Sequence, residues 1–139
     1  MKTGLYSNYS ILCVDDDPDD LQMLREAIAI VDGNCQIVEA HNGIEGLSQL
    51  EEMKSAGVFP SLIVLDINMP KMDGRQTFLS IRADESFSCI PIVIFSTSSS
   101  SLDRMFFTNK NVEYFIKPVS FTQCIEAAAK LLQHCKRMS

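Results

Sequence analysis

The sequence predicts an α/β protein, a (βα)₅ doubly wound parallel sheet with strand order 2-1-3-4-5. Short apolar runs alternate along the chain with longer segments in which apolar residues recur at helical spacing. The runs are apolar at every position, which is typical of strands buried on both faces. Right-handed crossovers would place helices on both faces of the sheet, as in a flavodoxin-like three-layer sandwich.

Five apolar runs are predicted as strands. Each contains three or four residues, the second is the weakest, and the fifth is expected to include Val112. The predicted strands span residues 11–14, 36–38, 62–65, 92–95 and 114–116.

Helix start and stop signals lie between these runs. Asp17 can cap a helix that begins at Pro18, and Asp32 with Gly33 ends it. The neighbouring acids Asp19 and Asp20 are assigned to the same helix start, where carboxylates favour the positive end of the dipole. Four more helices are predicted, over residues 43–55, 75–83 and 102–108 and from a cap at Ser120 almost to the end of the chain.

Length and composition indicate one domain. The chain has 139 residues, so we expect a tail over residues 1–9, one domain over 10–137 and no output domain. The net charge of −6 without a basic stripe excludes direct DNA binding. No signal pattern or long apolar stretch indicates a membrane, so a cytoplasmic location is expected. The five cysteines contain no C-x-x-C pair and predict neither a disulfide framework nor a zinc site.

Polar residues follow four of the predicted strands. Asp15 and Asp16 follow the first, Asp66 the third, Ser96 the fourth and Lys117 the fifth. The carboxyl ends of parallel strands meet at one edge of the sheet, and sites form there at the switch point of the strand order. We therefore expect these five side chains to lie together.

Such a group of acids predicts a cation. Two carboxylates about 4 Å apart repel by roughly 4 kcal/mol at an effective dielectric constant near 20, and Lys117 offsets only one of the three. Mg²⁺ prefers a few carboxylates, waters and a phosphate oxygen as ligands. A carboxylate can also act as a nucleophile toward phosphorus, and Asp66 is the central candidate.

The chain resembles the receiver domain of two-component response regulators, in particular the stand-alone chemotaxis receivers. The resemblance covers about residues 10–136. It depends on four motifs that occur in order and at matching spacing. They are the segment 11–16, the segment 66–74, Pro91 with Ser96 five residues later, and the segment 114–118.

The resemblance implies a metal site and a phosphorylation site that share Asp66. Asp66 is similar to the phospho-acceptor of the family. Asp16 and Asp66 look like direct Mg²⁺ ligands, Asp15 like a ligand acting through water, and the backbone carbonyl of Asn68 like the remaining protein ligand.

The resemblance also implies a switch. Ser96 and Lys117 look like the residues that contact the phosphoryl group, and Tyr114 like the switch aromatic that turns inward when Ser96 moves. Pro118 fits the family's cis peptide bond. The chain departs from the family in carrying Ser rather than Thr at position 96 and in the segment 106–111 before the fifth strand. Two alternatives follow for that segment: the fourth helix is shorter, or its turn uses Asn in a left-handed conformation.

The resemblance implies signalling partners. A sensor histidine kinase or a histidine phosphotransfer protein would supply the phosphoryl group, and an unknown protein target would recognise the switched face. A dimer through the fourth helix, fifth strand and fifth helix is possible. The chain would catalyse its own phosphorylation and slow autodephosphorylation, without being an enzyme acting on other substrates.

The sequence argues against two other functions. A Mg²⁺-dependent phosphohydrolase with an Asp nucleophile needs a second acid two residues later, where this chain has Asn68. A degenerate receiver that only binds partners is disfavoured by the complete set of acids, Ser96 and Lys117.

The sequence does not decide which face of the helix predicted over 102–108 points inward. One hypothesis places Leu102, Met105 and Phe106 inward and leaves Phe107 at the boundary or outside, where an exposed ring beside Tyr114 would contact a partner. The alternative, that both rings pack into the core, is about equally well supported.

Overall fold

The computed structural model describes residues 9–135, and its elements confirm the predicted (βα)₅ pattern. The elements are β1 (Tyr9–Val14), α1 (Pro18–Val31), β2 (Cys35–Ala40), α2 (Gly43–Ser55), β3 (Leu62–Leu65), α3 (Gly74–Ala83), the 3₁₀ turn η2 (Glu85–Phe87), β4 (Ile92–Ser96), α4 (Ser101–Thr108), β5 (Glu113–Ile116) and α5 (Phe121–Leu132).

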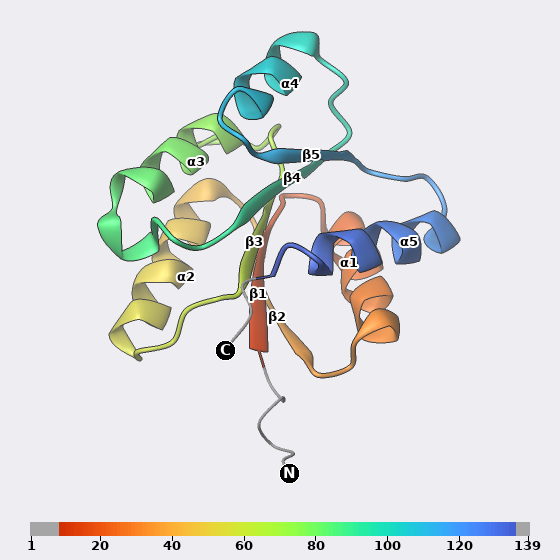
Figure 1. The fold of residues 1–139 in the computed structure, drawn as a ribbon, viewed down its shortest axis with the longest axis horizontal. Coiled ribbons are helices and arrows are strands. Elements are labelled where there is room, and N and C mark those ends of the chain that lie inside the picture. The colour runs from red at the N-terminus through yellow and green to blue at the C-terminus, as the bar shows by residue number, and fades with distance from the viewer. Residues whose placement is uncertain (1–8, 136–139) are drawn as a thin grey trace.

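The strands form one parallel sheet in the order β2-β1-β3-β4-β5, as predicted. Figure 1 shows α2 and α3 on one face of this sheet and α1 and α5 on the other. The strand order reverses beside β1, so the carboxyl ends of β1 and β3 form the switch point at which sites occur in such folds.

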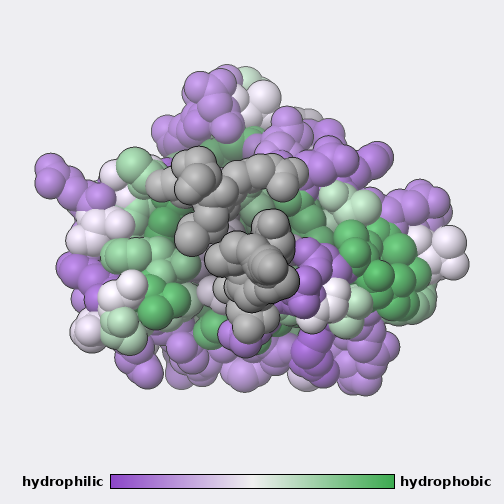
Figure 2. Space-filling model, turned by 60° about the horizontal axis from the view of Figure 1, so that its bottom comes forward, coloured by the Kyte–Doolittle hydropathy of each residue, from purple (hydrophilic) through white to green (hydrophobic). Residues whose placement is uncertain are grey.

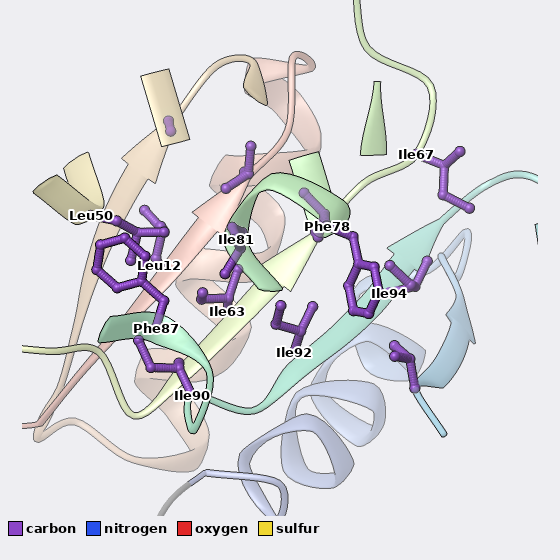
Figure 3. Packing of buried hydrophobic residues seen from close by; sticks show 14 of the residues in the cluster. Leu12, Leu50, Ile63, Ile67, Phe78, Ile81, Phe87, Ile90, Ile92 and Ile94 are labelled. Atoms are coloured by element: carbon purple, nitrogen blue, oxygen red, sulfur yellow. The ribbon is translucent and has the colours of Figure 1, made fainter. Parts of the chain in front are cut away.

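Side chains along each strand alternate between two hydrophobic cores. On β1, Leu12 and Val14 belong to the core under α2 and α3, while Ile11 and Cys13 belong to the core under α1 and α5. Figure 3 shows the first of these clusters, in which Phe78 from α3 meets side chains of the sheet. Each fully buried aliphatic side chain stabilises the fold by about 1.5–3 kcal/mol.

Polar side chains start the helices. Asp17 accepts hydrogen bonds from the backbone N–H groups of Asp19 and Asp20, and Pro18 occupies the first helical position, as predicted. Ser120 caps α5 in the predicted way, and Asp73 forms a capping box at the start of α3. Such caps contribute about 1 kcal/mol each, and the cap of α3 orients the loop that begins at Asp66.

Several boundaries differ from the predictions. β1 begins at Tyr9, because Tyr9 pairs in register with Cys35 and extends the pairing of β1 with the edge strand β2. Val112 is buried but precedes β5, which begins at Glu113. The rest of the predicted tail and the last residues of the predicted domain lie outside the described residues.

Of the two arrangements considered for α4, the one with both rings in the core is confirmed, and the one with Leu102 and Met105 inward is wrong. Phe107 has no exposed surface, whereas 72% of Leu102 and 58% of Met105 are exposed. Phe107 packs edge-on against Phe78 with ring centroids 5.5 Å apart, and Phe106 is partly buried against the same core. Both rings therefore belong to the core, and the exposed apolar side chains of α4 are aliphatic.

The turn after α4 follows one of the two alternatives considered, the left-handed Asn, and α4 keeps its expected length. Asn111 has a φ of 60°, the left-handed conformation expected of an Asn before the fifth strand. The N–H of Val112 then donates to the carbonyl oxygen of Phe107 at 2.9 Å and closes the turn.

Exposed apolar side chains are spread over the surface rather than gathered on one element. Figure 2 shows the molecule with the bottom of Figure 1 turned forward, and hydrophobic residues form separate patches among hydrophilic ones on this side. None of the helices within residues 9–135 has the length and apolar character needed to span a membrane.

Candidate functional site

The sheet brings the predicted site residues to one edge. Val14 pairs with Leu65, and the N–H of Asp66 donates to the carbonyl oxygen of Val14 at 3.0 Å, which places Asp66 next to the end of β1. On the other side, the N–H of Lys117 donates to the carbonyl oxygen of Ser96 at 2.9 Å. Backbone pairing in the sheet therefore fixes the backbone positions of Asp66 and Lys117.

Three carboxylates converge at the ends of β1 and β3. Oxygens from Asp15, Asp16 and Asp66, one from each residue, lie within 4.8 Å of one another. Asp15 and Asp66 are each only 6% exposed, whereas Asp16 is open to solvent. The predicted acidic cluster is thus formed, with two buried members and one that reaches the surface.

Lys117 is the ammonium of this site. Its Nζ lies 2.6 Å from Asp15, 2.8 Å from Asp20 and 3.5 Å from the Oδ2 atom of Asp66. Burial by itself would lower the pKa of Lys117, but the hydrogen bonds to Asp15 and Asp20 and the charge of Asp66 outweigh it and raise that pKa. Lys117 is therefore charged throughout the physiological range and is bound most closely to acids other than Asp66.

Burial raises the pKa of the Asp15 carboxyl to about 6. The hydrogen bonds from Lys117 and from the backbone N–H of Asp17 oppose this shift, and the charge of Asp66 adds to it. Asp15 is thus ionised at neutral pH at an energetic cost that a nearby cation would relieve.

The loop after β3 holds Asp66 in place. The Oδ1 atom of Asp66 accepts a hydrogen bond from the N–H of Ile67 at 2.9 Å, and the other oxygen, Oδ2, faces Lys117. Gly74, the first residue of α3, donates its N–H to the carbonyl oxygen of Ile67 at 2.8 Å. A Cβ atom at position 74 would lie 2.4 Å from the carbonyl oxygen of Asp66. Only glycine lets α3 approach this closely, while Asn68 in the same loop is exposed.

The two predicted switch residues are linked through Ser98. Ser96 is fully buried, and its hydroxyl oxygen accepts a hydrogen bond from the N–H of Ser98 at 3.2 Å. The hydroxyl of Tyr114 donates to the carbonyl oxygen of Ser98 at 2.7 Å. Tyr114 is partly buried, with its ring centroid 6.4 Å from that of Phe107. A movement of the loop at Ser98 would therefore reach both switch residues.

The same loop is tied to α3. The Ser98 hydroxyl donates to Asp103 at 2.9 Å, and Asp103 accepts from Arg75 at 2.6 Å. The Arg75 guanidinium also lies over the Phe106 ring, 5.1 Å from its centroid. This connection between α3 and α4 was not predicted from the sequence.

The expected cis bond before Pro118 is not found. No cis peptide bond occurs between residues 9 and 135, so the bond from Lys117 to Pro118 is trans. Trans is the lower-energy form of such bonds by about 0.5–1 kcal/mol.

Asp20 is a further site residue that the sequence analysis assigned only to the start of α1. Asp17 caps the helix, and the Asp20 side chain pairs with Lys117 instead. The signal in the sequence was its position in the first turn of the helix that directly follows Asp15 and Asp16.

The donor set fits a hard divalent cation. The three clustered carboxylates offer oxygen ligands. Within residues 9–135, no other group of three or more acids, histidines or cysteines lies close enough together to hold a metal. Oxygen ligands of this kind suit Mg²⁺ and related ions rather than metals that prefer sulfur or imidazole.

Comparisons with known proteins agree on the family. The family model of the response regulator receiver domain matches residues 11–129. The chain is 30% identical to the probable methanogenesis regulatory protein FilR2 of Methanothrix harundinacea over 81% of this chain and 74% of that protein. It is 31% identical to the sensor histidine kinase CheAY of Helicobacter pylori over 90% of this chain, which spans only 15% of CheAY.

Solved structures are similar as well. The phosphorylated cyanobacterial phytochrome response regulator RcpA superimposes with a TM-score of 0.81 at 26% identity, over 91% of this chain and 93% of RcpA. The fold, the clustered acids and the match over residues 11–129 all point the same way. The chain belongs to the response regulator receiver domain family of two-component signalling.

Proposed function

We propose that the chain is a phospho-acceptor switch that takes a phosphoryl group onto Asp66 in the presence of Mg²⁺. The observation that carries the proposal is the placement of Asp66, a buried carboxylate beside two other acids and an ammonium. RcpA, which has a similar structure, is described in its phosphorylated form. The donor would be a phosphohistidine on a sensor histidine kinase or a histidine phosphotransfer protein.

The transfer is a displacement at phosphorus. An oxygen of Asp66, for which Oδ2 is the candidate, forms the new O–P bond while the P–N bond to the donor imidazole breaks and its electron pair returns to the ring nitrogen. Lys117 and the hydroxyl of Ser96 would contact the phosphoryl oxygens. Asp15, Asp16, Asp66 and the backbone carbonyl of Asn68 would hold the cation. Bound Mg²⁺ would neutralise charge on the transferred group.

The residue at position 68 favours a switch over a hydrolase. Hydrolases that use an Asp nucleophile need a nearby acid or base to activate the attacking water, and Asn68 cannot serve. We therefore expect the acyl phosphate to be hydrolysed slowly, as a signal requires.

The switched face would include α4, β5 and α5. If Ser96 moves toward the phosphoryl group, its contact with Ser98 changes, and Ser98 also holds the Tyr114 hydroxyl. This is a shift between two states already available to the chain. A protein target, or a second copy, would bind this face, which exposes the apolar side chains of Leu102, Met105 and Ile116. The thiols of Cys13 and Cys124 form no disulfide, which supports a reducing, cytoplasmic location.

A small-molecule phosphoryl donor tests the chemistry. With acetyl phosphate and Mg²⁺, intact-mass analysis should show one added phosphate on the unmutated chain and none on Asp66→Asn. Asp19→Asn is the matched control, because it removes the same charge from an exposed acid and should be phosphorylated normally. Phosphate on the Asp66→Asn variant would show that the acceptor lies elsewhere.

A further inference from the structure

We propose that Asp20 is a positioning residue for Lys117. The Asp20 carboxylate holds the Lys117 ammonium away from Asp66 and competes with the phosphoryl group for that ammonium. The inference depends on the proposed function, because it concerns the lysine that would contact the phosphoryl group. Its first test, however, uses the unphosphorylated chain.

The geometry of Lys117 is the starting observation. Its ammonium is 2.8 Å from Asp20 but 3.5 Å from Asp66, although its side chain is only 7% exposed and points into the site. Ordinary N–H to oxygen hydrogen bonds span about 2.7–3.2 Å. Lys117 therefore forms short contacts with Asp15 and Asp20 and a long one with Asp66.

Asp20 is not needed for the start of α1. An acid in the third helical position commonly accepts a hydrogen bond from the backbone N–H of the cap residue. Here the N–H of Asp17 donates to Asp15 at 2.9 Å instead. The cap side chain itself satisfies the first free N–H groups of the helix. The Asp20 carboxylate is thus available for Lys117.

The adjacent acid gives an internal comparison. Asp19 lies in the same first turn of α1 and carries the same charge. It is exposed, and none of the hydrogen bonds or ion pairs within residues 9–135 involves its carboxylate. Any effect of Asp20 that Asp19 lacks must therefore come from its contact with Lys117 or its closer position.

An ammonium has three N–H donors, so its partners compete. In the resting chain two donors are occupied by Asp15 and Asp20. A phosphoryl group brings about 1.5–2 negative charges and three acceptor oxygens to Asp66. Lys117 must turn a donor toward that group, and the contact with Asp20 is the one that can be released, because 33% of the Asp20 side chain is already exposed to water. Asp20 therefore favours the unphosphorylated arrangement.

The first experiment is a crystal structure of unphosphorylated Asp20→Asn, with Asp19→Asn as the control. We expect the Lys117 ammonium to move within hydrogen-bond distance of Asp66 in Asp20→Asn and to stay in place in Asp19→Asn. A Lys117 that keeps its position in both variants would overturn the proposal. Thermal unfolding checks that both variants are folded.

The second experiment measures competition with a phosphoryl mimic. Fluoroberyllate with Mg²⁺ should bind Asp20→Asn about 2- to 5-fold more tightly than the unmutated chain, the range expected for a partly exposed ion pair. It should bind Asp19→Asn with unchanged affinity. The same pair of variants in a Lys117→Met background separates positioning from simple loss of charge. In that background the gain from Asp20→Asn should disappear.

The outcomes are distinct. A gain that persists without Lys117 would show that Asp20 acts only through its charge, and it would overturn the positioning role. If fluoroberyllate binds neither the unmutated chain nor any variant, the proposed phospho-acceptor function fails. In that case the position of Lys117 in the Asp20→Asn structure still decides what Asp20 does.

Discussion

Lys117 is the residue on which the charge balance of the site depends. It contacts three carboxylates, and a fourth, Asp16, belongs to the same cluster. Its side chain is slightly more buried than those of Asp15 and Asp66. Removing it would leave buried acids without a counter-charge, a change that is strongly destabilising in proteins.

The residues that follow the strands could be predicted from the sequence, but their pairing could not. The strand runs place Asp66 and Lys117 at one edge because parallel strands end together. Which acid Lys117 bonds depends on side-chain directions across three elements, so Asp20 was assigned to its helix and not to the site. The conformation of the bond before Pro118 likewise depends on the folded surroundings and was predicted wrongly.

Thiol reactivity provides a test at the scale of single residues. Burial raises the pKa of the Cys13 and Cys124 thiols, whereas Cys89 is exposed. Since the thiolate is the reactive form, iodoacetamide at pH 8 should alkylate Cys89 in the folded chain and leave Cys13 and Cys124 unmodified. Peptide mapping by mass spectrometry measures this, with the chain unfolded in guanidinium as the control. Alkylation of Cys13 as fast as Cys89 would contradict the described core.

Among the elements, α4 shows where periodicity fails. It has only eight residues, and Leu102, Met105, Phe106 and Phe107 can be arranged on more than one inward face. The structure selects Phe107 because its ring meets Phe78 of α3 and lies near Tyr114 of β5. The helices α1 and α5 were predicted more accurately, because they are longer and their starts are marked by Asp17 and Ser120.

Two truncations on α4 test this orientation. Phe107→Ala should lower the free energy of unfolding by about 3–5 kcal/mol, because it empties a fully buried site. Leu102→Ala is the control on the same helix and should change it by less than about 0.5 kcal/mol, since most of that side chain is exposed. Urea denaturation measures both, and similar losses for the two variants would show that α4 is rotated from the orientation described.

At the scale of the whole molecule, one sheet separates two cores and carries the acids at its edge. The cluster lies directly beyond the buried residues Val14 and Leu65. Repulsion among the acids therefore acts on the central strands, and a cation that relieves it should stabilise the entire fold.

Metal addition tests this coupling. Mg²⁺ at ten times its dissociation constant should stabilise the chain by about 1.4 kcal/mol, which raises the melting temperature by a few degrees. Asp16→Ala should abolish most of the increase and Asp15→Ala less of it, while Asp19→Ala should retain it. Differential scanning calorimetry with and without EDTA measures the shift. A melting temperature that does not change on addition of millimolar Mg²⁺ would mean that the cluster binds no such cation.

The contact between Asp20 and Lys117 joins residues 97 positions apart. A ribosome adds about 5–20 residues each second, so the acids at the end of β1 are made about 5–20 s before their lysine. During that interval the growing chain has neither the ammonium nor the edge strand β5, and its early acids stay in water. The resting charge balance of the site can therefore form only after the first four strands of the sheet have been synthesised.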